Sequence, residues 1–217
     1  MELEGFTIVP SILGDDELQD LLTALGSVSG AGRRGLLAMP VVAALAHSPK
    51  LLKLVRPYLP LEPLPVRAIY FDKSREANWL VPWHQDLTLA LQARAEVEGF
   101  GPWSVKDGIP HVQPPVACLE RMLTLRLHLD ETDATNGALR VLPGSHRFGR
   151  LSAAAIQDFR TWQPEVLCVA AAGDALLMRP LLLHASSRST SPRHRRILHI
   201  EYAAFALPAE LQWHEAA

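Results

Sequence analysis

Residues 123–130 read Leu-Thr-Leu-Arg-Leu-His-Leu-Asp, with a leucine at every second position. Side chains of a β-strand alternate between its two faces, so the four leucines share one face and the polar residues share the other. This pattern is typical of a strand that buries one face in a hydrophobic core and keeps a polar face. The segment therefore predicts an antiparallel sheet with one apolar and one polar side.

Other segments on both sides of this strand are rich in β-forming residues and are bounded by turn residues such as Asn136-Gly137. The predicted strands are 6–9, 66–71, 80–91, 138–142, 166–169, 175–184 and 197–205. The predicted helices are 15–26, 40–58 with a break at Pro49, and 152–159. Two early helices followed by many short strands predict an α+β domain, mainly β, built on a β-sandwich or barrel.

Two segments are predicted to be irregular because glycine and proline are frequent in them. Residues 27–35 are rich in Gly and Ser, and residues 99–115 contain three Gly and four Pro. A long loop in a compact domain is often functional, so we expect residues 99–115 to form a lid over an active site.

The composition of the chain excludes several functional classes. Its 217 residues are 48% hydrophobic and 20% charged, with a formal net charge of −2, so no basic field indicates nucleic acid or membrane as a partner. No stretch is long and apolar enough to predict a transmembrane helix, and the first ten residues have acids where a secretory signal has Lys or Arg. We expect a cytoplasmic protein.

His84-Gln85-Asp86 lies in a predicted strand, where residues two apart point to the same side, so His84 and Asp86 can bind one metal ion together. A second histidine from a facing strand would complete a two-histidine, one-carboxylate face, which leaves open positions on an octahedral iron. His184 is the best candidate, because it ends the apolar segment 175–184. Arg195 follows eleven residues later, where a hairpin would return its guanidinium beside the metal to bind a carboxylate.

A rival motif of the same form is His128-Leu129-Asp130. It lacks a following strand-end histidine with an arginine eleven residues later, and His146 lies in a Pro-Gly-Ser-His turn. We therefore favour the pair at 84 and 86, and interpret His128 and Asp130 as polar residues near a cavity or at the surface.

The motifs together resemble one known family. His-Gln-Asp at 84–86, Asn-Gly at 136–137, Leu-Pro-Gly-Ser-His at 142–146, Gly-Asp-Ala-Leu-Leu-Met at 173–178, and His184-x-Ser186 followed by Arg195 are similar to the phytanoyl-CoA dioxygenase family of iron(II)- and 2-oxoglutarate-dependent oxygenases. The resemblance implies a double-stranded β-helix, the cupin-like jelly roll, with flanking N-terminal helices. It implies one domain over 1–217, with a helical part at about 11–60 and a jelly-roll core at about 64–206.

The resemblance also assigns roles to residues. It implies His84, Asp86 and His184 as iron ligands, and Ser186, Arg195 and, more loosely, Trp103 as residues near 2-oxoglutarate. An aspartate at position 86 disfavours the halogenating relatives, which have a small residue there.

The expected activity is hydroxylation of a small organic substrate, with O2 consumed and 2-oxoglutarate converted to succinate and CO2. Candidates for lining the substrate cavity are Arg67, Lys106, His111, Gln113 and Arg126. The expected state is a monomer or homodimer. Two alternatives remain open at this point: a cupin-like metal-binding module without oxygenase activity, and a metal-dependent hydrolase or isomerase. A bare metal-binding module would need no carboxylate clamp, so Ser186 and Arg195 favour the oxygenase; a hydrolase or isomerase would usually need an extra general base, and none is evident.

Overall fold

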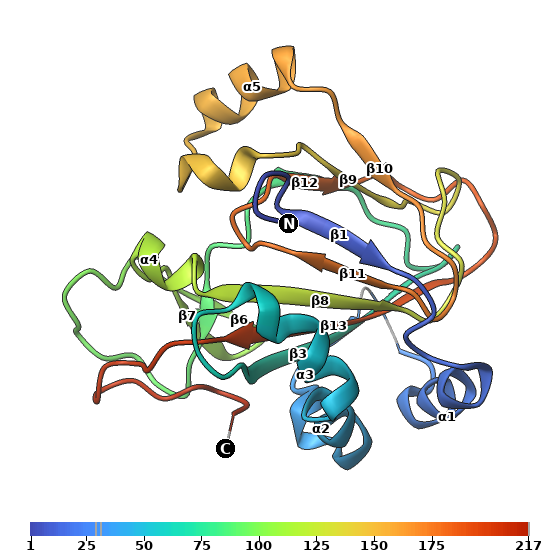
Figure 1. Ribbon diagram of the computed structural model, residues 1–217, viewed down its shortest axis with the longest axis horizontal. Helices are drawn as coiled ribbons and strands as arrows, with labels where there is room; N and C mark the ends of the chain where they lie inside the picture. The colour runs from blue at the N-terminus through green and yellow to red at the C-terminus, as the bar shows by residue number, and fades with distance from the viewer. Residues whose placement is uncertain (29, 31, 217) are drawn as a thin grey trace.

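The computed structural model describes residues 1–28, 30 and 32–216, and it consists mainly of antiparallel strands (Figure 1). The helices are α1 (Asp15–Leu25), α2 (Pro40–Ala46), α3 (Pro49–Val55), α4 (Val116–Leu119) and α5 (Ala153–Trp162), with short 3-10 helices at Leu36–Ala38, Arg56–Tyr58 and Ser145–Phe148. The predicted helices are confirmed. Gly26 ends α1 with a φ of 62°, and the hydroxyls of Ser48 and Ser152 cap α3 and α5 by accepting backbone N–H groups.

The largest sheet has six strands in the order β1-β11-β8-β13-β3-β2. Their bounds are β1 Phe6–Val9, β2 Gly32–Arg33, β3 Leu64–Lys73, β8 Met122–His128, β11 Ala175–Met178 and β13 Arg195–Ala203. A second sheet of four strands faces it, in the order β10-β9-β12-β4, with β4 Val81–His84, β9 Leu139–Val141, β10 Val166–Cys168 and β12 His184–Ser186 (Figure 1). Two facing antiparallel sheets are the arrangement that a jelly roll requires.

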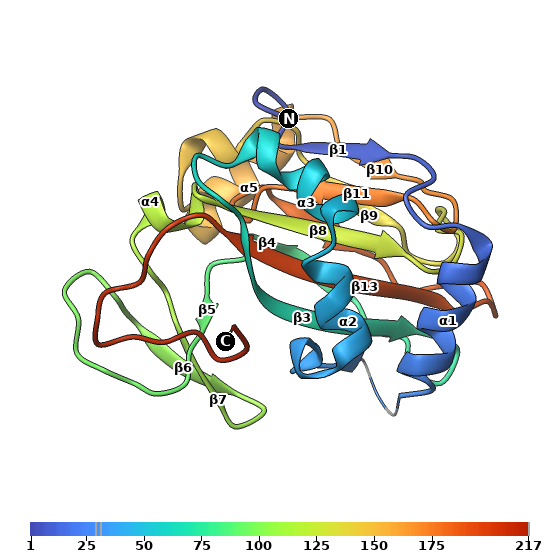
Figure 2. The same cartoon turned by 60° about the horizontal axis from the view of Figure 1, so that its bottom comes forward.

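A third, three-stranded sheet lies at one end of the molecule, in the order β5-β7-β6 (Figure 2). Its strands are β5 Leu89–Ala90, β6 Trp103–Lys106 and β7 Ile109–Val112. The prediction that residues 99–115 are irregular is therefore wrong for 103–106 and 109–112, which are strands. Asp107 and Gly108 both have positive φ and form a tight hairpin turn between β6 and β7, a turn that we had not recognised in the sequence.

The hydrophobic core lies between the outer face of the large sheet and the first three α-helices (Figure 2). The leucines at 123, 125 and 127 are fully buried there together with Leu21, Leu25, Leu51 and the outward-facing residues of β3 and β13. The alternation in 123–130 therefore describes the sheet correctly. Because the helices cover the apolar face, the polar face of β8 is left to point toward the second sheet.

Two further predictions are corrected by the topology. Residues 175–184 are not one strand: Pro180 lies in a crossover between β11 in the large sheet and β12 in the small sheet, so His184 begins a strand instead of ending one. Since β12 and β13 belong to different sheets, they do not form the predicted hairpin, and Arg195 approaches from the opposite sheet. Residues 27–35 were predicted as a loop but contain β2, while residues 29 and 31 lie outside the described part of the chain.

Within the described residues, none of the helices has the length and hydropathy needed to cross a membrane.

Candidate metal and co-substrate site

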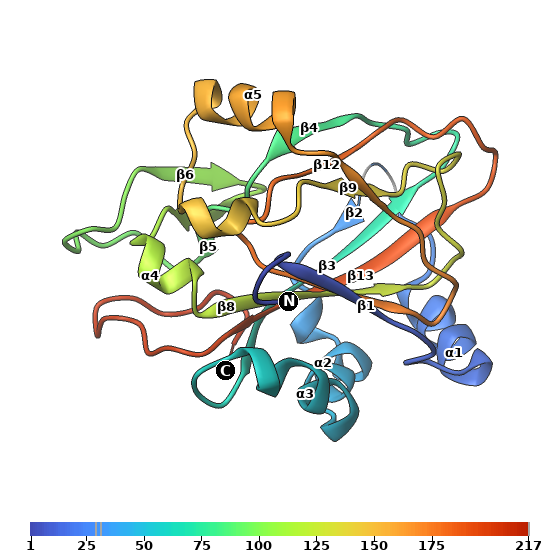
Figure 3. The same ribbon diagram turned by 45° about the horizontal axis from the view of Figure 1, so that its top comes forward.

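A cavity of about 340 Å³ lies between the two sheets. The large sheet contributes side chains from β3, β8 and β13, and the small sheet contributes side chains from β4 and β12 (Figure 3). Eight of the residues predicted from the sequence line it: Arg67, His84, Asp86, Lys106, Arg126, His184, Ser186 and Arg195.

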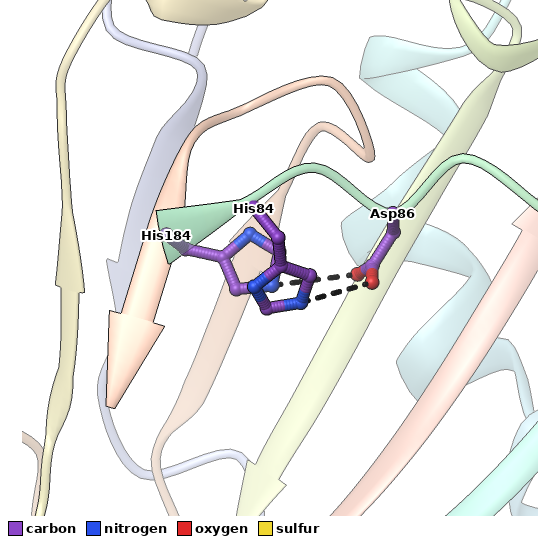
Figure 4. A group of neighbouring side chains, drawn as sticks. All are labelled: His84, Asp86 and His184. Carbon is purple, nitrogen blue, oxygen red and sulfur yellow. Dashed lines mark ion pairs between the residues drawn. The ribbon is translucent and has the colours of Figure 1, made fainter. Parts of the chain in front are cut away.

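His84, Asp86 and His184 converge in this cavity (Figure 4). Strand pairing sets His184 directly opposite His84, and the two imidazole rings are 4.1 Å apart between centroids. The Nε2 atoms of His84 and His184 each lie 3.6 Å from an oxygen of the Asp86 carboxylate. One potential ligand atom from each residue lies within 4.8 Å of the other two, so a single ion can contact all three.

Backbone contacts orient the two imidazoles for this purpose. The Nδ1 atom of His84 is 2.9 Å from the carbonyl of Pro82, and that of His184 is 2.9 Å from the carbonyl of Leu182. A carbonyl only accepts, so each Nδ1 carries the proton and each Nε2 presents a lone pair toward Asp86. A hydrogen bond from the remote nitrogen is the usual device that fixes a metal-binding histidine.

Electrostatics keep the carboxylate charged. Desolvation alone would raise the pKa of Asp86, but the neighbouring imidazoles of His184 and His84 outweigh it and hold that pKa well below its usual range. Burial lowers the pKa of His184 to about 4, so its ring is neutral at pH 7. Desolvation opposes the charged form of His84 as well, yet the nearby Asp86 carboxylate raises its pKa overall. A divalent cation can replace that proton.

The residues fit a two-histidine, one-carboxylate metal centre on three observations of the structure: the donor set, the convergence of the donor atoms, and the free Nε2 lone pairs. The central residue of the motif supports the geometry. The amide of Gln85 donates to the carbonyls of Gly149 and Leu181 and accepts from the N–H of Leu151, which pins the segment between the two ligands.

Arg195 reaches the cavity from β13 and is 3% exposed. Its NH1 group donates to the carbonyl of Gly137, 2.8 Å away, while its Nε–H is buried without a hydrogen-bond partner among the described residues. The hydroxyl of Ser186 also donates to Gly137, at 2.8 Å. A buried guanidinium with unused donors and no carboxylate partner is suited to bind an anion.

Lys73 was missed in the sequence. It is fully buried, and its ammonium donates to the hydroxyl of Ser186 at 2.9 Å and to the carbonyl of Ser187 at 2.6 Å. Burial and the nearby charges of Arg195 and Arg126 lower its pKa to about 7. The available signal was the alternation of β3, since Arg67, Ile69, Phe71 and Lys73 occupy every second position, but only the pairing of β3 with β13 shows that Lys73 lies beside Arg195.

A chain of buried hydrogen bonds crosses the inner face of the large sheet. Arg126 donates to Nδ1 of His199 at 2.8 Å, so Nε2 of His199 carries the proton and donates to Glu201 at 3.3 Å. Arg67 donates to the same oxygen of Glu201 at 3.1 Å. His199 and Glu201 were not predicted as site residues; strand parity with Arg195 was the signal that could have found them.

Three predicted residues lie outside the cavity wall. Trp103 packs into an apolar cluster beneath β6, with Val112 and Leu119 among its members. His111 is fully buried in β7, where its Nδ1 atom bonds the carbonyl of Ile109, and Gln113 follows β7. Of the predicted residues on the β6–β7 hairpin, Lys106 lines the cavity, whereas Trp103 and His111 do not.

The rival motif does not form a metal site. His128 bonds the hydroxyl of Thr132 at 2.9 Å, and burial lowers its pKa to about 3. Asp130 instead accepts hydrogen bonds from the side chain of Arg196 at 2.6 and 2.8 Å and from its backbone N–H. In the part of the chain that the structure describes, the metal-binding cluster is the one at 84, 86 and 184.

Several solved structures resemble this fold. The chain is similar in structure to SnoK, a non-heme alpha ketoglutarate dependent carbocyclase from nogalamycin biosynthesis, at 18% identity and a TM-score of 0.70, covering 100% of this chain and 84% of that one. It is also similar to EctD from S. alaskensis with bound Fe, at 20% identity and a TM-score of 0.73, covering 98% of this chain and 79% of that one. HygX from Streptomyces hygroscopicus, solved with nickel and 2-oxoglutarate bound, gives 18% identity, a TM-score of 0.64, and coverage of 93% and 83%.

At these identities the likeness shows the shared jelly-roll fold, which confirms the predicted fold class. No curated protein sequence matches the chain significantly. The model of the family described as phytanoyl-CoA dioxygenase matches residues 1–197, which is most of the chain. The chain therefore belongs to the phytanoyl-CoA dioxygenase family and is an oxygenase that uses iron(II), 2-oxoglutarate and O2.

Proposed function

We propose that this enzyme hydroxylates a small organic molecule, with iron(II) held by His84, Asp86 and His184. One observation carries the proposal: the three donor side chains converge in a cavity that is also lined by the buried, carboxylate-free Arg195. The bound iron would supply the activation of O2, coupled to decarboxylation of 2-oxoglutarate to succinate.

The protein's own contribution at the metal is geometry and charge. His84 and His184 offer neutral Nε2 atoms because their Nδ1 protons are held by backbone carbonyls. Asp86 stays ionised, so the three residues together offer one negative charge to a divalent cation. Because these three residues line one cavity, an ion that they held would have positions left for a chelating 2-oxo acid and O2.

We propose that Arg195, Ser186 and Lys73 bind the distal carboxylate of 2-oxoglutarate. Arg195 offers unused N–H groups, and Lys73 adds a second cation through its contact with Ser186. The Ser186 hydroxyl donates to Gly137 in this structure, so we infer that it rotates toward the carboxylate when the co-substrate binds. Both cations are buried without a carboxylate partner, which makes binding of an anion there strongly favourable.

The cavity then leaves the substrate between the metal ligands and the tip of the β6–β7 hairpin. The apolar side chains of Leu87, Leu119 and Met122 line this part, which excludes water from the reacting atoms. Trp103, His111 and Gln113 have no place in this proposal.

The test combines binding and turnover. Metal-free enzyme is titrated anaerobically with iron(II) and then with 2-oxoglutarate, following the charge-transfer absorption that a chelated 2-oxo acid gives with iron(II). A panel of small organic molecules is then screened for succinate formation above the background measured without substrate, and hydroxylated products are identified by mass spectrometry. The Asp86→Ala variant should show neither absorption nor succinate, while Asp130→Ala should retain both. An absence of charge-transfer absorption in the wild type would refute the proposal.

A further inference from the structure

The cavity is rich in positive charge. Among the described residues that line it, five are basic, namely Arg34, Arg67, Lys106, Arg126 and Arg195, and two are acidic, namely Asp86 and Glu201. Iron(II) and dianionic 2-oxoglutarate carry opposite charges of equal size, so their binding leaves this excess unchanged. A cavity that stays positive after both have bound favours an anionic substrate.

We call the part of the cavity next to the tip of the β6–β7 hairpin its mouth. The basic side chains there differ in whether a carboxylate neutralises them. Arg67 is paired with Glu201 at 3.1 Å, and Arg34 is paired with Asp107 at the tip of the β6–β7 hairpin. The other two cations that line the cavity, Arg126 and Arg195, are both buried. Lys106, by contrast, has no carboxylate partner among the residues that the structure describes.

The surroundings of Lys106 support this reading. Its ammonium contacts one side-chain oxygen, the hydroxyl of Thr88, at 3.2 Å. Desolvation and then the charge of Arg67, with that of Arg34, lower its pKa. All three cations line the same cavity. The Nε–H of Arg34 is buried and has no partner among the described residues, which leaves a donor unused at the same place.

Apolar side chains line the same cavity, among them those of Leu87, Leu119, Met122 and Pro180. A ligand with an anionic end at Lys106 would place an apolar body against these side chains and reach toward His84 and Asp86.

We propose that the substrate has an apolar body and a terminal anionic group, a carboxylate or a phosphate, bound by Lys106 together with Arg67 and Arg34. This inference rests on the proposed function, because it assumes that the metal and 2-oxoglutarate occupy the deeper end. In this proposal, Lys106 is the residue that selects anionic substrates over neutral ones.

The test uses three six-carbon probes: hexanoate, hexyl phosphate and the neutral hexanamide. Enzyme loaded anaerobically with iron(II) and 2-oxoglutarate is titrated with each probe, and the dissociation constant is read from the change in the charge-transfer absorption. The wild type should bind at least one anion about tenfold or more tightly than hexanamide, as expected for one charge-assisted contact. The anion with the lower dissociation constant shows whether the site prefers a carboxylate or a phosphate.

Variants assign the effect to one residue. Lys106→Gln should lower the ratio of the dissociation constants of hexanamide and the anion to about one. Lys106→Arg should keep most of the difference because the charge is retained. Lys53→Gln, at an exposed lysine on α3, is the matched control and should keep the full preference. Formation of the charge-transfer absorption before any probe is added verifies the proposed function separately. Equal binding of hexanamide and the anions, no binding by either anion, or an unchanged preference in Lys106→Gln would each overturn the inference.

Discussion

The segments His84-Gln85-Asp86 and His128-Leu129-Asp130 have the same spacing and lie in the same way, with the histidine ending a strand and the aspartate beyond it. Their surroundings differ. His84 faces His184 on the neighbouring strand, so Asp86 has two imidazoles to contact. His128 faces Ile197, and Asp130 is held by Arg196. The spacing places two side chains within reach of each other, but the adjacent strand decides whether they form a metal centre or an ion pair.

The largest expected effect separates the two aspartates. Asp86→Ala should weaken iron(II) binding by more than about 100-fold, since loss of outer-shell partners alone costs 10–100-fold. Asp130→Ala should leave iron binding unchanged and lower the free energy of unfolding by about 1.5–3 kcal/mol, because charge-assisted hydrogen bonds to Arg196 are lost. Metal titration and urea denaturation of both variants measure the two effects. Similar iron affinity in the two variants would contradict the assignment.

The next effect separates two adjacent arginines that serve the two motifs. Arg195→Ala should raise the concentration of 2-oxoglutarate needed for half-saturation about 100-fold or more, as breaking one side of a buried charge pair costs about 3–5 kcal/mol. Iron binding should change little, and Arg195→Lys should recover only part of the loss because an ammonium cannot form two parallel bonds. Arg196→Ala is the control, with reduced stability and normal 2-oxoglutarate binding. If Arg196→Ala instead carries the binding defect, the assignment of faces in β13 is wrong.

A smaller effect is expected at Lys73 on β3, which lies opposite Arg195 on the neighbouring strand β13. Lys73→Met should weaken 2-oxoglutarate binding about tenfold at pH 7, the loss of roughly one charge-assisted hydrogen bond. Because burial lowers the pKa of Lys73 to about 7, the free enzyme loses this positive charge as the pH rises. The affinity of the wild type should therefore fall between pH 7 and pH 9, and that of Lys73→Met should stay flat. Calorimetric titrations at both pH values test this; a parallel decline in both proteins would contradict it.

The smallest effect is a difference in titration between the two histidines. In metal-free enzyme, the pKa of His84 is raised by Asp86, while burial lowers that of His128 to about 3. Protonation of His84 thus stabilises the fold below its pKa, and this contribution is lost as the pH rises. His128 acts in the opposite sense: below about pH 6.5 the unfolded chain binds its proton first, so stability falls as the pH drops.

The measurement is an NMR titration of the imidazole protons, assigned with His84→Gln and His128→Gln. Addition of a divalent metal should abolish the titration of His84 and leave His128 unaffected. A titration of His128 near neutral pH, or one that responds to the metal, would show that the second motif also binds metal.

The parts that could be predicted from the sequence depend on local periodicity. The alternation of 123–130 and of Arg195 with His199 assigns the outer and inner faces of β8 and β13 correctly, because parity is a property of the strand itself. The three residues at 84, 86 and 184 could be selected because their spacing and the following arginine occur together.

The rest depends on contacts that periodicity does not encode. The segment 99–115 contains many Gly and Pro, and the strands β6 and β7 within it form by pairing with each other and with β5. Trp103 was assigned from the resemblance alone, and its position in the structure depends on the pairing of β6 with β7. The role of Lys73 required the register between β3 and β13, which two distant segments determine together.

The position of the site between the sheets has a consequence for the mechanics of the fold. His84 and His184 belong to the small sheet and Arg195 to the large one, so a molecule held by both joins the two halves of the sandwich. Bound iron and co-substrate then link the two sheets, so the free energy of unfolding rises with their concentration by mass action. Separation of the two sheets would break these contacts, so it requires the co-substrate to dissociate. Slow exchange of the amide protons in β12 and β13 should therefore report how long the loaded enzyme keeps its co-substrate.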